Sequence, residues 1–177
     1  MAKRGKKRRT QRGQPHDSLF KVTFSEPTNA FDLLRHVLPT AVLEAIDASS
    51  LRHEPGSFVD VELAQLHSDV LLSARLHGQP ALLYVLFEHQ ATVDRFMPVR
   101  LTRYVMRVWE RWLRDHPRTT TLPAVVPIVI HQGPGRWDAP RRLTELVDLP
   151  VELLGRLERF MPALDMIVDD LGALSPA

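Results

Sequence analysis

Two apolar segments separated by a short turn constrain the fold of this chain more than any other feature. Residues 69–76 and 81–88 each have the length of a β-strand, and His77-Gly78-Gln79-Pro80 lies between them. Two residues are the commonest connection in a β-hairpin, and we take Gly78 and Gln79 as the turn. The sequence therefore predicts an antiparallel hairpin, whose second strand is apolar almost throughout, as a strand buried on both faces would be.

This register places two acidic residues opposite each other. Asp69 would pair with Glu88, with their side-chain stems roughly 5 Å apart on one face, and Gln90 would point the same way as Glu88 because it follows two residues later. Like charges at that distance repel unless a cation lies between them, and Mg²⁺ prefers carboxylate oxygens. The pair is therefore a candidate metal site. The alternative is a three-residue loop, which would put two solvated acids out of phase.

The other apolar patterns predict an α/β fold, in which a mixed sheet carries helices on its faces. From residue 27 to residue 131 the expected order is helical, then three strands, then a helix and a last strand. That last strand follows a long crossover helix, which favours a sheet with parallel and antiparallel pairs. The expected helices are 27–38, 40–46 and 97–116, the expected strands are 57–63, 69–76, 81–88 and 125–131, and short helical pieces are expected at 143–147, 151–160 and 164–171.

Charge divides the chain into a basic tail and an acidic body. The first 14 residues carry seven positive charges and no negative charge, which leaves 16 basic and 21 acidic residues in the rest. Such a block is expected to be disordered and to attract nucleic-acid phosphates. The alternative is an incidental, solubilising terminus. The tail residues predicted to contact DNA are Lys6, Lys7, Arg8 and Arg9.

Composition excludes several classes of protein. The chain has no cysteine, so disulfides, thiolate metal sites and cysteine nucleophiles are ruled out. No run approaches the ~20 apolar residues of a membrane span, and no signal peptide is visible. We therefore expect a cytoplasmic protein without a membrane partner. Its 177 residues suit one domain of ordinary size.

Short motifs occur in a fixed order along most of the chain. They are His16-Asp17-Ser18-Leu19-Phe20-Lys21, Leu33-Leu34, Leu38-Pro39, Ile46-Asp47, Ser50-Leu51, Ser68-Asp69, Glu88-His89-Gln90, Met97-Pro98, Arg100-Leu101 and Arg103-Tyr104. In order and spacing this set resembles the Rpn family of recombination-promoting nucleases, also described as YhgA-like transposases, within the PD-(D/E)XK superfamily. The resemblance implies a nuclease-like core at 15–137 of order αβββαβ, between the tail at 1–14 and a short helical segment at 138–177.

The resemblance also implies an activity, a cofactor and a site. The expected activity is a metal-dependent endonuclease acting on double-stranded DNA and linked to recombination or mobile elements, with Mg²⁺ as the ion and Mn²⁺ able to substitute. Asp69 and Glu88 match the metal-binding acids, and Gln90 stands at the lysine position of the superfamily motif, as it does in the Rpn family. A neutral amide can orient a water only by hydrogen bonds. Ala91 departs from the family, which tends to have Ser there.

Other charged residues keep two interpretations each. Lys21, the only lysine after the tail, is either a displaced catalytic lysine or a solvated charge. Asp17 is either a third carboxylate or a helix cap. Arg100 and Arg103 begin an arginine stripe that either contacts the DNA backbone or pairs with nearby acids. We give His131-Gln132-Gly133 no role beyond a turn.

Two rival functions stay open. One is a catalytically inactive or truncated nuclease-fold protein that binds DNA or regulates. The other, ranked last, is a cut-and-paste transposase, which would need a different spacing of acids. Sequence leaves the oligomeric state undecided, a homo-oligomer included.

Overall fold

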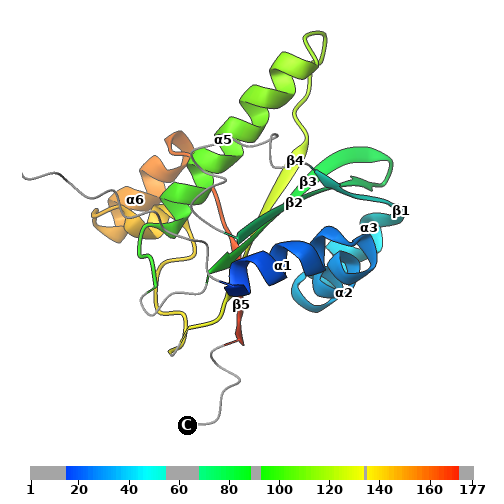
Figure 1. The fold of residues 1–177 in the computed structure, drawn as a ribbon. Coiled ribbons are helices and arrows are strands. Elements are labelled where there is room, and N and C mark those ends of the chain that lie inside the picture. The colour runs from blue at the N-terminus through cyan, green and yellow to red at the C-terminus, as the bar shows by residue number, and fades with distance from the viewer. Residues whose placement is uncertain (1–14, 55–67, 89–92, 134, 172–177) are drawn as a thin grey trace, which may run out of the picture.

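A five-stranded mixed sheet runs through the molecule, with its strands in the order β1-β2-β3-β4-β5 (Figure 1). The computed structural model describes residues 15–54, 68–88, 93–133 and 135–171; within these, the side chains of residues 15–18, 21, 68, 69 and 84–88 are not described. β1, β2 and β3 pair antiparallel, whereas β4 is parallel to both β3 and β5. The strands are β1 (Ile46–Glu54), β2 (Ser68–Leu76), β3 (Gln79–Glu88), β4 (Ala124–His131) and β5 (Ile167–Asp170).

Helices pack on both faces of this sheet. Prolines mark their ends: Pro27 and Pro98 lie in the first turns of α2 and α5, where the missing N–H is not needed, and Leu38 is extended before Pro39, which ends α2. None of the described helices is long and apolar enough to cross a membrane. The helices are α1 (Pro15–Ser25), α2 (Pro27–Val37), α3 (Thr40–Ala45), α5 (Met97–Asp115) and α6 (Val151–Leu157), with 3-10 turns η2 (Leu143–Leu146) and η3 (Glu158–Phe160).

The strands β2, β3 and β4 separate two hydrophobic clusters. Leu83 is fully buried and packs with Leu34 of α2, whereas Leu82, the preceding residue of β3, packs with Leu101 of α5. Successive residues of a strand point to opposite faces, so a strand covered on both sides must be apolar at every position. The predicted burial of this strand on both faces is confirmed for Ala81, Leu82 and Leu83, the described side chains of the predicted span 81–88. Figure 1 shows α1 and α2 on one side of the sheet and α5 across the other.

The hairpin turn differs from the expected one by one residue. Leu76 pairs with Gln79, so His77 and Gly78 are the turn residues, and both have positive φ (47° and 81°). Positive φ at both central positions is the requirement of a type I′ turn, in which glycine is favoured second. The predicted Gly78-Gln79 turn was wrong because Pro80 would then close it, and proline has no N–H to donate across a tight turn.

Two strands were not predicted in their observed places. β1 occupies residues 46–54, beyond the predicted helix 40–46, and the strand predicted at 57–63 lies outside the described residues. Residues 164–171 were predicted to be helical, yet Ile167 and Val168 lie in β5 and pair with Ile128 and Val129 of β4. Periodicity cannot distinguish a helix from a strand in so short an apolar run. Here the segment is a strand because it pairs with β4.

The register of β1 against β2 shifts between Asp47 and Arg52, where the pairing of the strands is irregular. The Asp47 carboxylate accepts hydrogen bonds from the hydroxyl (2.7 Å) and backbone N–H (3.0 Å) of Ser49. These bonds hold the pKa of Asp47 below its ordinary value of 3.8. The Ser50 hydroxyl donates to the Asp47 carbonyl and accepts from the Arg75 N–H of β2 (2.8 Å), so the irregular segment stays joined to the sheet.

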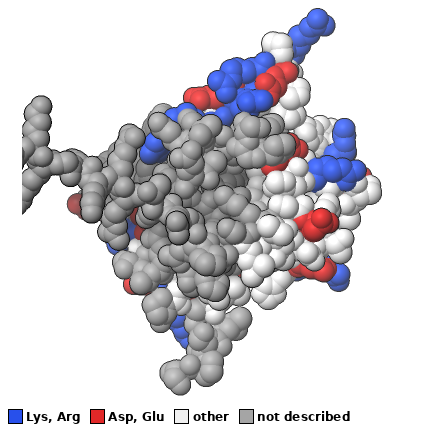
Figure 2. Space-filling view, viewed as in Figure 1, with Lys and Arg blue, Asp and Glu red and all other residues white. Residues whose placement is uncertain are grey.

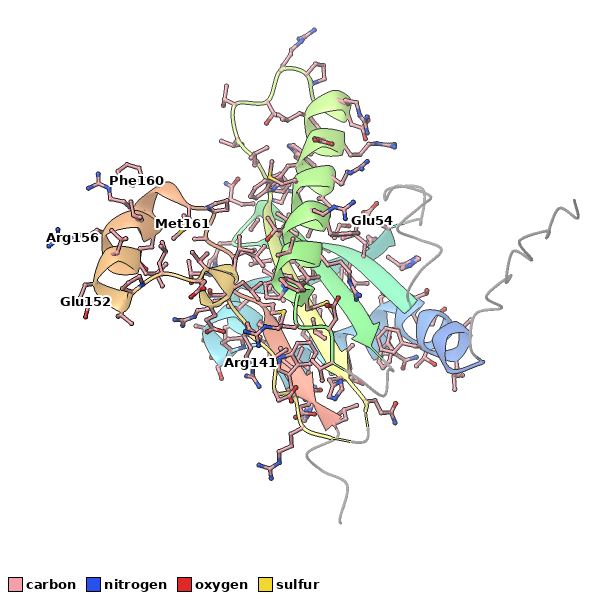
Figure 3. The ribbon with its side chains drawn as sticks, turned by 90° about the vertical axis from the view of Figure 1, so that its left-hand side faces the viewer. Glu54, Arg141, Glu152, Arg156, Phe160 and Met161 are labelled. Atoms are coloured by element: carbon pink, nitrogen blue, oxygen red, sulfur yellow. The ribbon has the colours of Figure 1, made fainter. Side chains whose placement is uncertain are left out.

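The segment after β4 combines helical turns with the last strand. α6 and η3 lie apart from the sheet, and Phe160 points outward at their end (Figure 3). Its side chain is 75% exposed, with the Arg159 guanidinium 5.1 Å from the ring centroid. Of the helical pieces predicted after β4, the one at 151–160 is confirmed, whereas the one at 164–171 is wrong because residues 167–170 form a strand.

Candidate active site

Four chemically reactive positions lie at one edge of the sheet. Because β3, β4 and β5 are parallel, their carboxyl ends meet at this edge, and β2 begins there because it runs antiparallel to β3. Glu88, His131 and Asp170 are the last residues of β3, β4 and β5, and they are in register with one another. Asp69 is the second residue of β2. Ligand sites of open α/β sheets form beyond the carboxyl ends of their strands.

Asp69 and Glu88 are diagonal neighbours on the hairpin, not direct partners. Asp69 pairs with Leu86, and Glu88 lies two residues farther along β3. The predicted direct pairing was wrong because the turn is displaced by one residue. That displacement changes the register by two residues, so both positions still fall on the same face of the sheet. Diagonal neighbours are roughly 7–8 Å apart, within reach of a shared ion. Their side chains and the whole of Gln90 lie outside what the structure describes.

This face is the one that α5 covers. Leu71 of β2, Leu82 of β3 and Val129 of β4 belong to the cluster that packs against α5. Asp69, Glu88 and His131 each differ from one of these residues by an even number of positions, so alternation places them on the same face. The cluster under α5 therefore ends, at the edge of the sheet, in a row of polar positions.

His131 is the buried member of this row. Its side chain is 1% exposed, and its Nε2 lies 3.1 Å from the carbonyl oxygen of Gly135. A carbonyl only accepts, so Nε2 carries a proton, and in the neutral imidazole Nδ1 presents a lone pair. Nδ1 has no hydrogen-bond partner among the residues that the structure describes.

Asp170 is held beside it by Trp137. The backbone N–H of Trp137 donates to Asp170 Oδ2 at 2.8 Å, and the Trp137 ring meets the His131 ring edge-on with centroids 5.5 Å apart. Asp170 Oδ1 is buried and, within the described part of the chain, also lacks a partner. Two buried acceptors that no described donor reaches make this edge suitable for a bound cation.

The described side chains alone do not make a complete metal site. No group of three His, Cys, Asp or Glu side chains comes together among them, and those of Asp69 and Glu88 are not part of this set. The acids that could complete the ligand set are therefore the two that the hairpin register brings to the same edge. Carboxylates at that edge would fit Mg²⁺ or Mn²⁺.

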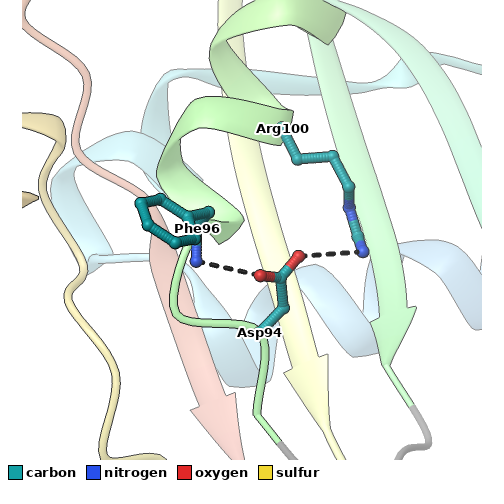
Figure 4. Close-up of polar contacts among 3 residues, drawn as sticks. All are labelled: Asp94, Phe96 and Arg100. Carbon is teal, nitrogen blue, oxygen red and sulfur yellow. Dashed lines mark hydrogen bonds and ion pairs between the residues drawn. The ribbon is translucent and has the colours of Figure 1, made fainter.

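Asp94 organises the start of α5 near this face. One carboxylate oxygen accepts the Phe96 N–H at 2.9 Å, and the other lies 3.4 Å from Nη1 of Arg100 (Figure 4). The Arg100 side chain is 23% exposed. Arg103, one turn later, is exposed. Of the two arginines predicted to contact DNA, one is thus engaged by an acid.

The rest of the arginine stripe follows the projecting part of α5. Arg111 pairs with Asp115 at 2.6 Å, which is the acid-pairing alternative for that residue. Figure 2 shows basic side chains gathered along this helix with acidic ones between them. Lys21 and Asp17 lie on α1, but their side chains are not described, and the tail residues Lys6, Lys7, Arg8 and Arg9 lie outside the described residues.

Comparison with known proteins identifies the family. The model of the family described as "Putative transposase, YhgA-like" matches residues 14–176. The chain belongs to this family. No solved structure matches it.

Relatives within the family carry nuclease names. The chain is 40% identical over 119 residues to "Recombination-promoting nuclease RpnD" of Escherichia coli O157:H7, an alignment that covers 67% of the chain and 45% of that relative. It is 35% identical over 123 residues to "Recombination-promoting nuclease RpnA" of Escherichia coli K12, covering 70% and 41%. The chain thus spans less than half the length of these nucleases.

Other relatives are named as inactive. "Putative inactive recombination-promoting nuclease-like protein YjiP" of Escherichia coli K12 is 43% identical over 94 residues, which cover 53% of the chain and 91% of that relative. "Inactive recombination-promoting nuclease-like protein RpnE" of the same strain is 32% identical over 119 residues, or 67% of the chain and 39% of that relative. Some members of this family are therefore named as nucleases and others as inactive.

Sequence reasoning gave His131 only a turn and passed over Asp170. A signal for His131 was present, because it ends the β-branched run of β4 as Glu88 ends β3. Asp170 had no such signal, since its segment was taken for a helix. Only the pairing of β5 with β4 brings it to the edge.

Proposed function

We propose that this protein is a metal-dependent DNA endonuclease that takes part in recombination. The observation that carries the proposal is the register of the hairpin, which brings the Asp69 and Glu88 positions to one face at the edge where three parallel strands end. The nuclease names of the relatives RpnD and RpnA support it. The order of elements also supports a PD-(D/E)XK core: helix, three antiparallel strands, a crossover helix and a parallel fourth strand.

In this proposal the acids, the glutamine and the basic residues have different roles. Asp69 and Glu88 hold a divalent cation by their carboxylates, and Gln90 orients the attacking water by its amide. The bound ion supplies Lewis acidity, which lowers the pKa of water and neutralises charge on the phosphate. Arg103 and the basic tail contact the DNA backbone, which fixes position without reading sequence.

The test is cleavage of supercoiled plasmid by the purified full chain. We expect nicking with Mg²⁺ or Mn²⁺ and none with EDTA. Glu88→Gln and Asp69→Asn should each lower the rate at least ~100-fold, since loss of a charged ligand removes several kcal/mol of transition-state stabilisation. Asp169→Asn is the matched control because Asp169, also a strand carboxylate, pairs with His36 of α2 at 3.8 Å and is next to Asp170 in β5. It should cleave like the parent.

Equal cleavage by the parent and Glu88→Gln would show that the site is wrong. A folded parent that binds DNA but never nicks it would instead place the chain with the relatives named as inactive, as a DNA-binding protein. Circular dichroism of each variant separates loss of activity from loss of fold.

A further inference from the structure

We propose that His131 and Asp170 are two further ligands of the cation at this edge and that His131 makes the site prefer Mn²⁺ over Mg²⁺. The inference deepens the proposed function, on which it rests for the acids of the hairpin. It concerns residues of β4 and β5, outside the hairpin that carries Asp69 and Glu88.

The first step is the state of the imidazole. The Gly135 carbonyl accepts a hydrogen bond from Nε2 of His131 at 3.1 Å, and no hydrogen-bond partner of Nδ1 is found among the described residues. Histidines that bind metals are held in this way, with the other ring nitrogen donating to a carbonyl or carboxylate. A buried imidazole with one fixed and one unused nitrogen is therefore preorganised to bind a cation.

The second step is the carboxylate. Trp137 holds Asp170 Oδ2 through its backbone N–H, which fixes the side chain and leaves Oδ1 buried without a donor among the described residues. Burying an acceptor that makes no hydrogen bond is costly, and a charged one more so. In the tautomer that the Gly135 carbonyl selects, the proton of the neutral imidazole is on Nε2, so Nδ1 has none to donate to Oδ1.

The third step is that both residues lie on the same face of adjacent strands. His131 and Asp170 are register partners on adjacent parallel strands, and both contact Trp137. Glu88 is the register partner of His131 on its other side. The row Glu88, His131 and Asp170 thus combines two carboxylates with one imidazole, at one end of the sheet.

The ligand types decide which ion fits. Mg²⁺ takes oxygen ligands and keeps its waters, whereas imidazole nitrogen favours transition ions. A site of carboxylates and one imidazole is therefore expected to bind Mn²⁺ more tightly than Mg²⁺. With His131 removed, that preference should become weaker.

The test titrates the full chain with MnCl₂ and MgCl₂, without DNA. Free Mn²⁺ is measured by electron paramagnetic resonance, and Tm is followed by scanning fluorimetry. His131→Gln keeps an N–H near the ε position for Gly135 and removes the Nδ1 lone pair. We expect it to weaken Mn²⁺ binding by about tenfold or more with little effect on Mg²⁺. Asp170→Asn should weaken both ions, and the control Asp169→Asn neither.

Asp170→Asn adds a readout that needs no metal. Its amide oxygen can still accept from Trp137, and its NH₂ would replace a buried, charged acceptor with a neutral donor. Because the buried charge is removed, the metal-free variant should melt at or above the Tm of the metal-free parent. The same variant should lose the Tm increase that Mn²⁺ produces in the parent.

The outcomes separate this inference from the nuclease proposal. Mn²⁺ binding that His131→Gln and Asp170→Asn leave intact but Glu88→Gln removes would overturn the inference and leave the nuclease site standing. If Mn²⁺ binding depends on His131 but the parent never nicks DNA, the inference would stand and the nuclease proposal would be overturned. A parent that binds neither ion would sink both.

Discussion

The carboxylate of Asp94, just before α5, distinguishes Arg100 from Arg103, which the sequence alone predicts to contact DNA equally. Asp94 lies 3.4 Å from Arg100 and accepts the Phe96 N–H, so Arg100 serves the start of the helix. Arg103 is exposed. A guanidinium already paired with a carboxylate would have to give up that partner to bind a phosphate. The two residues should therefore differ in their effect on DNA binding.

We expect Arg103→Ala to weaken binding of duplex DNA more than Arg100→Ala does. If Arg103 contacts one phosphate, its removal should reduce the slope of log K against log salt by about 0.9. Fluorescence anisotropy of a labelled duplex at several salt concentrations measures this slope. Arg35→Ala, on α2 across the sheet, is the control and should leave it unchanged. A larger effect of Arg100→Ala would contradict this assignment.

At the scale of elements, the hairpin shows both the reach and the limit of sequence reasoning. The bounds of β2 and β3 were predicted to within two residues, because length, turn residues and apolar runs all agree. The turn was misplaced by one residue, although Pro80 carried the information. Its missing N–H is harmless where it lies, since β4 begins to pair only at Ala81.

The turn residues make a direct test of the observed register. Gly78 has φ of 81°, and a Cβ there would meet no atom within 4 Å, so Gly78→Ala adds backbone strain without a clash. It should cost roughly 1–2 kcal/mol of unfolding free energy. His77→Asn should be stabilising, because Asn adopts positive φ more readily. Urea denaturation measures both. The Gly78-Gln79 turn would predict no gain from His77→Asn.

At the scale of the whole molecule, local patterns indicated the elements but not all of their neighbours. The helices of residues 27–45 and 97–115, the hairpin and β4 were expected nearly where they lie. β5 was missed because a four-residue strand is stabilised by its partner rather than by its own sequence. The same holds for the site. The acids of the hairpin could be predicted from the sequence, whereas Asp170 could be placed only once β5 was seen to pair with β4.

The charge division makes a prediction for the full chain. Deleting residues 2–13 removes all seven basic residues of the tail and leaves a net-negative protein. If the tail holds DNA, duplex affinity should fall, and the salt slope should shrink by about 0.9 for each phosphate that the tail neutralises in the parent. Tm should stay the same, because the deletion removes no residue of α1 or the sheet. An unchanged slope would mean that the tail is incidental.

The parallel ladder of β3, β4 and β5 also bears on the order in which the chain folds. The hairpin closes locally and can form within microseconds. Its pairing with β4 must wait for α5 and its flanking loops to be brought back across the sheet, and the pairing of β5 spans a further long connection. Such non-local contacts are slow to form because loop closure must come first. A folding intermediate can therefore have both hairpin acids in place while the His131 and Asp170 half of the row is still missing.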